Sequence, residues 1–439
     1  MKVAKFGGSS LAEAAQFRKV AAIVHADPDR RYIVASAPGK RSSDDTKITD
    51  MLYSCYRLAT QKQSIDEAFA QIEARYDGII AELGLDLDMK EEYDKIRMAI
   101  RHHAGEDYVA SRGEYLNAMI LAKYLGFTFV DAENGIFFRT DGTFDDKRTY
   151  ATLYDLLKDV DHAVVPGFYG SMPNGTIKTF TRGGGDITGA IVARSVHADI
   201  YENWTDVSGM LMADPRIVKN PKVIEEITYR ELRELAYMGA TVMHEETVFP
   251  VQEGNIPINI RNTNSPSDAG TMIVPFSSSN EVETVITGVA GRKGFSSITI
   301  EKSKMNTEVG FGRKVLGVLE RMGLCFEHIP TGIDTMSIVV SSASIADCKD
   351  ELTARIFRDT EADTVYIEDG IALVSVVGRG MVRAKGTAAR IFSAIARQNI
   401  NIRMIDQFAG EKHIILGVDE ADYALTLQTI YSEFVQEGK

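Results

Sequence analysis

The sequence is poor in cysteine and has no long apolar run. Its three cysteines, Cys55, Cys325 and Cys348, are far apart and form no C-x-x-C pair, which fits ordinary thiols in a reducing compartment. No stretch of roughly 18 apolar residues occurs, so we expect no membrane-spanning helix. The first residues also lack the basic and then apolar pattern of a secretory signal, and we therefore expect a cytoplasmic protein.

Positive charge is scarce as well. The chain has 49 lysine and arginine residues against 62 aspartate and glutamate residues, which gives a net charge of −13. This balance argues against nucleic acid or an anionic membrane surface as the main partner, although small anions respond to local charge alone. With 439 residues, 44% of them hydrophobic, the chain has the composition of a globular protein of two or three domains.

Several catalytic motifs are missing. The absence of G-x-S-x-G leaves a serine hydrolase without support, and "HEETV" at His244 lacks the second histidine of a zinc-binding helix. "GRG" at residues 378–380 is only a partial dinucleotide motif, because Arg383 stands where its third glycine belongs. The remaining candidates for chemistry are glycine-rich turns and isolated charged residues.

Up to about residue 260 the sequence alternates short apolar strands with helical stretches. "RYIVASAPG" (31–39) and "HAVVPGFYG" (162–170) indicate strands that end in turns, and "DITGAIVARSVHA" (186–198) indicates a helix. This alternation predicts an α/β sandwich with a largely parallel sheet. Ligands of such sheets bind at the carboxyl ends of the strands, which is also where the glycine-rich stretches of this chain fall.

The composition changes near Asn264, where proline, serine and glycine become frequent. Beyond this point an order of strand, glycine-containing loop, helix and strand occurs twice. The predicted helices are Arg313–Arg321 and Ala384–Gln398, and they lead into predicted strands at Leu324–Ile329 and Ile400–Ile405. Two copies are too few for a solenoid and predict a pair of small α/β modules.

The first glycine-rich turn, "KFGGSS" at residues 5–10, follows a short predicted strand. Its two adjacent glycines let the backbone turn sharply and let a ligand approach closely. Ser10 and Glu13 match a capping box, so we expect a helix to begin at Ser10. A helix N-terminus beside Lys5 suits a phosphate group, but a plain tight turn with a solvated lysine explains the same residues.

The second glycine-rich turn is "TFTRGGGDITGA" (179–190), in which three glycines follow Arg182 and Asp186 begins a helix. Arg182 suits a carboxylate or a phosphate, and Asp186 suits Mg²⁺ that is bound to phosphates. A flexible loop with an aspartate at the helix N-cap is the alternative.

Two further stretches carry candidate groups. In "WTDVSGMLMADPRI", Thr205 and Asp206 close a strand, and Asp214 and Arg216 form a turn. These four residues can line a nucleotide, or they can form a simple connection with a surface ion pair. In "SRGEYLNA", Glu114 near a helix start either captures an ammonium group or favours the helix dipole.

Taken together, these stretches resemble aspartate kinase over the whole chain. "KFGGSS", "VASAPG", "SRGE", "TRGGGD", "WTDVSG", "ADPRIV" and "ELAYMGATVMHEETVFP" occur in the family's order and spacing. The resemblance implies an α/β catalytic domain of the amino-acid-kinase type, a three-layer sandwich with a mainly parallel sheet, followed by two ferredoxin-like ACT modules. The implied boundaries are 1–280 for the catalytic domain, 281–365 for the first module and 366–439 for the second. The leading strand of the first module is a candidate for sharing with the second.

The resemblance also implies an activity, the ATP- and Mg²⁺-dependent phosphorylation of the β-carboxylate of L-aspartate to 4-phospho-L-aspartate. This is the first step toward lysine, threonine and methionine. A carboxylate is already ionised at neutral pH, so no general base is needed, in agreement with the missing histidine motifs. By the match, the residues at the transferred phosphoryl group are Lys5, Gly7, Gly8, Ser9 and, near Mg²⁺, Asp186. Those that hold aspartate are Thr49, Glu114 and Arg182, and those that line the ATP site are Thr205, Asp206, Asp214 and Arg216.

Three residues depart from the family pattern. Gly185 stands where the family usually has serine, Thr241 where many members have lysine, and Leu211 where a tyrosine is frequent. We expect modified substrate and ATP contacts and not a loss of activity, because the principal charged residues remain.

Regulation is implied by the ACT modules, which commonly pair between subunits and bind amino acids. We expect a homodimer or homotetramer, with lysine as the first choice of inhibitor and threonine as the second. The candidate effector residues are Met305, Phe311, Cys325 and Phe326. The alternative is that their apolar side chains form the core of the module. One alternative is another kinase of the same fold, although Glu114 and Arg182 favour an α-amino acid over substrates such as carbamate or a nucleotide. The other alternative is a non-catalytic amino-acid sensor.

Overall fold

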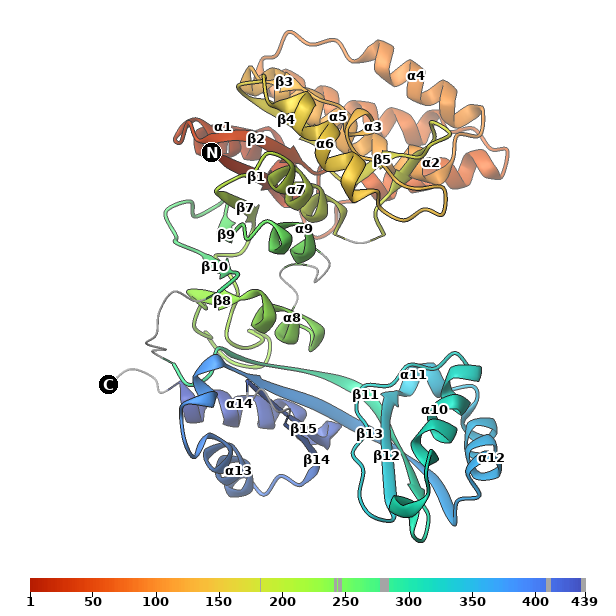
Figure 1. The fold of residues 1–439 in the computed structure, drawn as a ribbon. Helices are drawn as coiled ribbons and strands as arrows, with labels where there is room; N and C mark the ends of the chain where they lie inside the picture. Colours follow the sequence, from red (N-terminus) through yellow and green to blue (C-terminus); the bar gives the residue numbers. More distant parts are fainter. Residues whose placement is uncertain (182, 241–242, 244–246, 277–283, 408–411, 436–439) are drawn as a thin grey trace. The chain divides into compact units, whose positions relative to one another are not determined.

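The computed structural model describes residues 1–181, 183–240, 243, 247–276, 284–407 and 412–435 (Figure 1). The chain divides into two compact units. The first unit comprises Met1–Met210, Val223–Leu232 and Val242–Ser278, and the second comprises Leu211–Lys222, Arg233–Thr241 and Ser279–Lys439. No helix in the described ranges has both the length and the apolar character needed to cross a membrane.

The described part of the first unit is built on an eight-stranded sheet with the order β3-β4-β2-β1-β7-β9-β10-β8. Every pair of neighbours in this sheet is parallel except β9 and β10. This confirms the predicted α/β class with a mainly parallel sheet. The strands are β1 (Lys2–Phe6), β2 (Arg30–Ala35), β3 (Thr128–Phe129), β4 (Ala163–Pro166), β7 (Ile200–Thr205), β8 (Glu226–Thr228), β9 (Ile258–Asn262) and β10 (Thr271–Val274).

Helices cover both faces of this sheet (Figure 1). Alternate residues of β1 face opposite ways, so that Ala4 and Phe6 join the apolar core beneath α1–α5, whereas Lys5 faces α7. The helices of this unit are η1 (Gly8–Leu11), α1 (Ala14–His25), α2 (Ile48–Thr60), α3 (Asp66–Leu83), α4 (Lys90–Arg101), α5 (Glu106–Leu125), η2 (Ala132–Asn134), α6 (Asp146–Leu157), α7 (Gly184–Ser195) and α9 (Val248–Glu253). Helix α8 (Tyr229–Tyr237) begins in the first unit and, from Arg233 on, belongs to the second. A small hairpin of β5 (Tyr169–Ser171) and β6 (Ile177–Thr179) precedes α7.

The helix expected to begin at Ser10 begins later. Residues Gly8–Leu11 form a 3₁₀ turn, and α1 starts at Ala14 without a side-chain cap. The Ser10 hydroxyl lies 2.8 Å from the hydroxyl of Thr263 and is thereby bound to a distant segment of the unit. A tertiary hydrogen bond has replaced the local capping bond that the spacing of Ser10 and Glu13 predicted.

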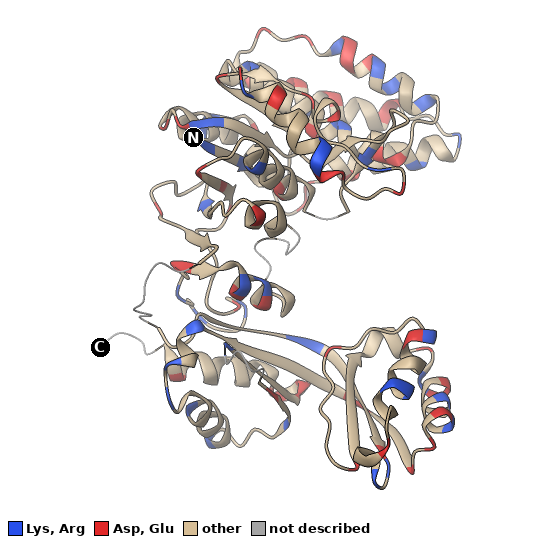
Figure 2. Ribbon diagram, viewed as in Figure 1, with Lys and Arg blue, Asp and Glu red and all other residues tan. Residues whose placement is uncertain are grey.

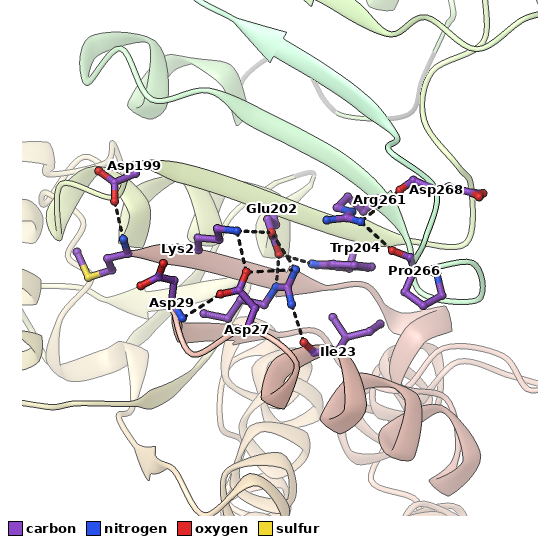
Figure 3. A network of polar contacts seen from close by, with 12 residues as sticks. Lys2, Ile23, Asp27, Asp29, Asp199, Glu202, Trp204, Arg261, Pro266 and Asp268 are labelled. Carbon is purple, nitrogen blue, oxygen red and sulfur yellow. Dashed lines mark hydrogen bonds and ion pairs between the residues drawn. The ribbon is translucent and has the colours of Figure 1, made fainter.

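A network of ion pairs joins β1, β2 and β7, three adjacent strands at the centre of the sheet (Figure 3). Nε of Arg30 in β2 lies 2.7 Å from Oε2 of Glu202 in β7, and these residues are only 6% and 1% exposed. The indole N–H of Trp204 donates to the same carboxylate at 2.8 Å, and Lys2 of β1 pairs with Asp27 at 2.7 Å. Because a buried charge is costly without its partner, the network fixes how β1, β2 and β7 align.

The second unit contains a five-stranded antiparallel sheet, within the described residues, of order β12-β11-β13-β15-β14. Its strands β11 (Gly288–Glu301) and β13 (Thr364–Val377) have 14 residues each and pair along both halves. The others are β12 (Thr335–Ser341), β14 (Ile402–Asp406) and β15 (His413–Asp419). The helices are η4 (Met305–Thr307), α10 (Phe311–Arg321), α11 (Ser342–Ile345), α12 (Lys349–Thr360), η5 (Arg379–Val382), α13 (Thr387–Arg397), η6 (Glu420–Asp422) and α14 (Tyr423–Phe434).

Helices α10 and α12 pack on one half of the long strands, and α14 packs on the other (Figure 1). The predicted strand at Ile400–Ile405 is present as β14, whereas residues 324–329 contribute a single bridge from His328 to Val339. Pro330 has no N–H group to continue that ladder. Charged residues of both signs alternate along helices such as α4 and α12 (Figure 2).

Removal of the buried carboxylate of Glu202 should destabilise the first unit. We expect Glu202→Ala to lower its free energy of unfolding by about 3–5 kcal/mol, because Arg30 is left buried and unpaired. Trp204, the single tryptophan of the chain, lies in this unit and reports its unfolding by fluorescence during a urea titration. As a control, Asp161→Ala removes an exposed partner of Arg31 and should leave the midpoint nearly unchanged. Equal urea midpoints for the two variants would contradict the proposed contribution of the network to the stability of the unit.

Candidate functional site

The loops that follow β1 and β2 touch each other through their backbones. The N–H of Gly39 donates to the carbonyl of Gly8 at 2.8 Å. A Cβ atom on Gly8 would lie 2.9 Å from the Ala37 oxygen, and one on Gly39 would lie 2.7 Å from the Gly8 carbonyl carbon. Both positions therefore require glycine. Gly7 completes the turn, and its N–H donates to the carbonyl of Trp204 in β7 at 3.0 Å.

The three consecutive glycines before Asp186 are required by backbone conformation or by close neighbours. Gly183 has a φ of +59°, in the left-handed region. A Cβ on Gly184 would overlap the side chain and the Cα atom of Phe168, and one on Gly185 would lie 2.8 Å from the Ser36 hydroxyl. The Ser36 hydroxyl thus occupies the space beside residue 185, where related sequences are expected to place a serine.

Lys5 and Asp186 form an ion pair at the carboxyl end of the sheet. Nζ of Lys5 in β1 lies 2.5 Å from Oδ1 of Asp186 in the first turn of α7. The carboxamide of Asn203 in β7 contacts both residues, because Lys5 donates to its Oδ1 at 3.4 Å and its Nδ2 donates to Asp186 at 3.1 Å. Lys5 is buried and Asp186 is partly exposed. The site therefore presents a cation and an anion side by side.

Helix α5 places a second carboxyl group at the loop after β2. Glu114 is only 7% exposed and accepts a hydrogen bond from the N–H of Ala37. Its Oε2 atom is buried without a hydrogen-bond partner among the described residues. Burial raises the pKa of this carboxyl group to about 8. A buried, unpartnered carboxyl oxygen suits an ammonium group, which would supply both the missing hydrogen bond and the opposite charge.

Two further side chains support the same loops. Asn117, one turn after Glu114, donates to the carbonyl of Ser36 at 2.6 Å. Arg75 of α3 donates to the carbonyl of Gly39 at 2.7 Å and pairs with Asp45 at 2.8 Å. Hydrogen bonds from the Arg41 guanidinium hold the pKa of Asp45 well below its usual range. Arg75 and Asp45 also line a cavity of about 780 Å³ between α2 and α3, away from Lys5 and Glu114.

The remaining predicted nucleotide and substrate residues lie in several places. Thr49 is partly exposed in the first turn of α2, and Ser9 lies in η1 beside Gly8. Thr205 ends β7, and its hydroxyl donates to the exposed carboxylate of Asp206 at 3.1 Å. Arg182 and Thr241 lie outside the described residues.

Asp214 and Arg216 belong to the second unit, whereas Lys5, Glu114 and Asp186 belong to the first. Asp214 and Arg216 pair with each other at 2.6 Å, and this hydrogen bond holds the pKa of Asp214 below its usual range. Their segment, which starts at Leu211, bonds to α14 of the same unit, where Gln428 donates to the carbonyl of Ile217 at 2.7 Å. Their assignment to the nucleotide stays a prediction.

The four predicted effector residues are divided between core and surface. Met305 and Phe311 are buried in the apolar core beneath α10 and α12. Cys325 is exposed, and Phe326 is 46% exposed. The first two therefore stabilise the module, and only the second two are open to a ligand in the chain as it stands.

The donor set fits a magnesium ion that arrives with a nucleotide. The described residues contain no cluster of three or more acidic, histidine or cysteine side chains that could hold a metal alone. Mg²⁺ usually keeps several waters and takes one or two carboxylates together with phosphate oxygens. Asp186, partly exposed in the first turn of α7, fits the part of such a carboxylate.

Three polar residues of this site were not singled out from the sequence: Ser36, Asn117 and Asn203. Ser36 and Asn117 lie inside the motif stretches "VASAPG" and "SRGEYLNA", the second of which also contains Glu114. The only signal for Asn203 is the presence of an amide side chain in the middle of the predicted strand "IYENWT". Its partners on neighbouring elements decide its role, and the sequence does not show them.

Substitution of Gly184 should disturb the site. Gly184→Ala would push a methyl group into Phe168, whose backbone already has a φ of +82°, and we expect a loss of about 1–3 kcal/mol. Gly78 in α3 has open space around it, so Gly78→Ala should stabilise the unit by about 0.5–1 kcal/mol. Urea unfolding followed by Trp204 fluorescence compares the two variants. The packing argument is wrong if Gly184→Ala proves as stable as Gly78→Ala.

Comparisons with known proteins agree with this architecture. The model of the amino acid kinase family matches residues 1–262, and an ACT domain model matches residues 374–434. Aspartokinase 3 of Bacillus subtilis (strain 168) is 39% identical, over 99% of this chain and 98% of the relative. The crystal structure of Clostridium acetobutylicum aspartate kinase is 49% identical, covers 99% of this chain and 100% of that one, and superimposes with a TM-score of 0.93.

The fold is also that of E. coli aspartokinase III, which has been solved with aspartate and ADP and with lysine and aspartate. These two structures are 24% identical to this chain, cover 99% of it and almost all or all of their own length (99% and 100%), and have TM-scores of 0.75 and 0.73. The matches run through both units, from the glycine turn at Lys5 to the ACT region. The chain belongs to the aspartokinase family.

Proposed function

We propose that the protein transfers the γ-phosphoryl group of ATP to the β-carboxylate of L-aspartate, forming 4-phospho-L-aspartate and ADP. This would be the first step toward lysine, threonine and methionine. The observation that carries the proposal is the buried, unpartnered Oε2 of Glu114 close to the Lys5–Asp186 pair, in a chain related to aspartokinases along its full length. Residues 36 and 37 link the two groups, because Ala37 bonds to Glu114 and Ser36 lies beside Gly185.

Glu114 supports an α-amino acid as the acceptor. Its unpartnered oxygen would receive the ammonium group of aspartate, and Thr49 at the start of α2 would bind the same substrate. By the family motif, Arg182 would bind a carboxylate of the substrate, as an arginine suits this group. The structure of E. coli aspartokinase III was solved with aspartate, a substrate of this kind. This division fixes the amino end of the substrate on α5 and leaves its side-chain carboxylate toward Lys5.

The reaction needs charge neutralisation and alignment. The β-carboxylate is ionised and attacks without a base, so two anions must be held close together and in line. Lys5 would donate to the transferring phosphoryl group, and the glycine turns let the backbone of Gly7, Gly8 and Ser9 approach it. Mg²⁺, when bound, would neutralise phosphate charge, and Asp186 would hold it. Thr205 and Asp206, and by the family match Asp214 and Arg216, would line the nucleotide.

The first assay measures acyl-phosphate formation, trapped with hydroxylamine, from ATP and Mg²⁺ with L-aspartate, L-glutamate or no amino acid. We expect turnover with aspartate alone. Lys5→Ala should lower kcat by at least about 100-fold, because the transferring phosphoryl group loses its cation, while folding stays intact. Lys158→Ala, at an exposed lysine after α6, serves as the control and should have normal activity.

Two outcomes would overturn the proposed activity. Turnover with glutamate and not with aspartate would identify a different amino-acid kinase of this fold. No turnover with either substrate, in a folded protein that still binds amino acids, would identify an amino-acid sensor.

The pKa of Glu114 predicts a pH dependence of aspartate binding. Only the ionised carboxylate attracts an ammonium group, so the affinity for aspartate should rise as pH increases from 6 through the pKa of about 8. Glu114→Gln should raise the aspartate KM at least about tenfold at pH 8.5 and abolish this dependence. A KM that stays constant from pH 6 to 8.5 in the unmodified enzyme would refute the assignment.

The same group predicts an effect on stability with the opposite pH trend. The folded protein binds this proton more tightly than the unfolded chain, in which the pKa is about 4.3. Its contribution to stability is therefore complete below that value and is lost as pH rises through about 8. Relative to the unmodified chain, Glu114→Gln should gain stability between pH 6 and 9 in urea titrations.

We propose further that the enzyme is cytoplasmic, as its isolated cysteines favour, and that it is a homodimer or homotetramer assembled through the ACT modules. A regulatory amino acid would bind there, near the exposed Cys325 and Phe326, with the buried Met305 and Phe311 behind them. Lysine is the first candidate and threonine the second, and either can be added to the same acyl-phosphate assay.

A further inference from the structure

Strand β7 presents two polar side chains to helix α7. Tyr201 and Asn203 are two residues apart and therefore share one face of the strand. The Tyr201 hydroxyl donates to the carbonyl of Asp186 at 3.1 Å, and the Asn203 amide donates to its carboxylate at 3.1 Å. The first turn of α7 is thus bonded to β7 through both the main chain and the side chain of Asp186.

Asn203 also lies directly beside Lys5. The two residues are partners in the parallel ladder of β1 and β7, so their side chains leave neighbouring strands on the same face of the sheet. Asn203 is only 2% exposed, and its Oδ1 atom lies 3.4 Å from the Lys5 ammonium. A carboxamide is suited to this position because it offers an acceptor to the cation and a donor to the anion while it adds no charge.

The contact to Asp186 becomes important when substrates bind. The Lys5 ammonium pairs with Asp186 at 2.5 Å, but during the proposed phosphoryl transfer it must donate to the phosphoryl oxygens instead. The Asp186 carboxylate then loses its closest partner. The Asn203 amide, fixed on a buried strand, can keep the carboxylate in its orientation throughout.

We propose that Asn203 is a positioning residue of the reaction, which holds the Asp186 carboxylate in place while Lys5 turns to the phosphoryl group. The inference rests on the proposed kinase function. It predicts that loss of the amide reduces the rate of transfer and weakens the use of Mg²⁺, with little effect on aspartate, whose ammonium group is held by Glu114 on a different helix.

Asn203→Leu tests the proposal, because leucine has nearly the same size and neither donor nor acceptor. We expect kcat to fall about 10- to 100-fold, the aspartate KM to change less than about threefold, and half-activation to need more Mg²⁺. Asn259→Leu is the matched control, a buried asparagine on β9 whose ladder partner on β7 is Glu202, next to Asn203. This control should keep the kcat of the unmodified enzyme and its requirement for Mg²⁺.

Asn203→Asp provides a second test that does not depend on the folding of the leucine variant. The groups that face this position are Lys5 on β1, Asp186 on α7 and Tyr201 on β7. An aspartate here keeps an acceptor for Lys5, but it repels Asp186 and no longer donates to it. We therefore expect kcat to fall about 10- to 100-fold, as in Asn203→Leu, while the aspartate KM changes less than about threefold.

The outcomes separate the two proposals. Aspartate-dependent turnover in the unmodified chain, with kcat unchanged in Asn203→Leu or in Asn203→Asp, would overturn the role of Asn203 and leave the kinase function intact. A fall in kcat that is matched by Asn259→Leu would show a merely structural effect and would also overturn it. The absence of turnover in the unmodified chain would overturn both.

Discussion

The contact between the loops after β1 and β2 positions every other group of the site. Gly8 and Gly39 touch through backbone atoms alone, and no side chain fits between them. The contact joins the end of β1, which carries Lys5, to the segment after β2, where Ser36 lies beside Gly185 of α7 and the N–H of Ala37 donates to Glu114 of α5. The carboxyl ends of neighbouring parallel strands are where the ligands of such sheets bind.

The two helical layers supply different parts of the chemistry around this contact. Helix α7 brings Asp186 from one face of the sheet, while α5 brings Glu114 and Asn117 from the other. The groups proposed to meet the ammonium group and the Mg²⁺-bound phosphates, Glu114 and Asp186, therefore lie on separate helices. Arg75 on α3 supports the contact between the loops, since it donates to the carbonyl of Gly39, whose N–H bonds to Gly8.

The sequence was sufficient for the class of fold, and it singled out Lys5 and Asp186, which the structure brings together as an ion pair. It was insufficient wherever a distant partner determines the local structure. The helix start at Ser10 moved because Thr263 takes its hydroxyl, and the strand before Pro330 shrank to one bridge. Asn203 could not be assigned, because an amide in a buried strand acquires meaning only from Lys5 and Asp186 beside it. That Asp214 and Arg216 fall in the second unit is likewise invisible in a motif read as one continuous stretch.

The long strands of the second unit have a consequence for the order of its assembly. In the sheet, residues Gly288–Arg292 of β11 pair with the far half of β13, Leu373–Val377, and Gly294 at a φ of +88° separates them from the rest of the strand. The half of the sheet beneath α10 and α12 is enclosed in sequence between these partners. During synthesis it can close upon itself first, while residues 288–292 lack their partner strand until about 80 more residues have left the ribosome. The half that begins earlier in the chain is thus completed last.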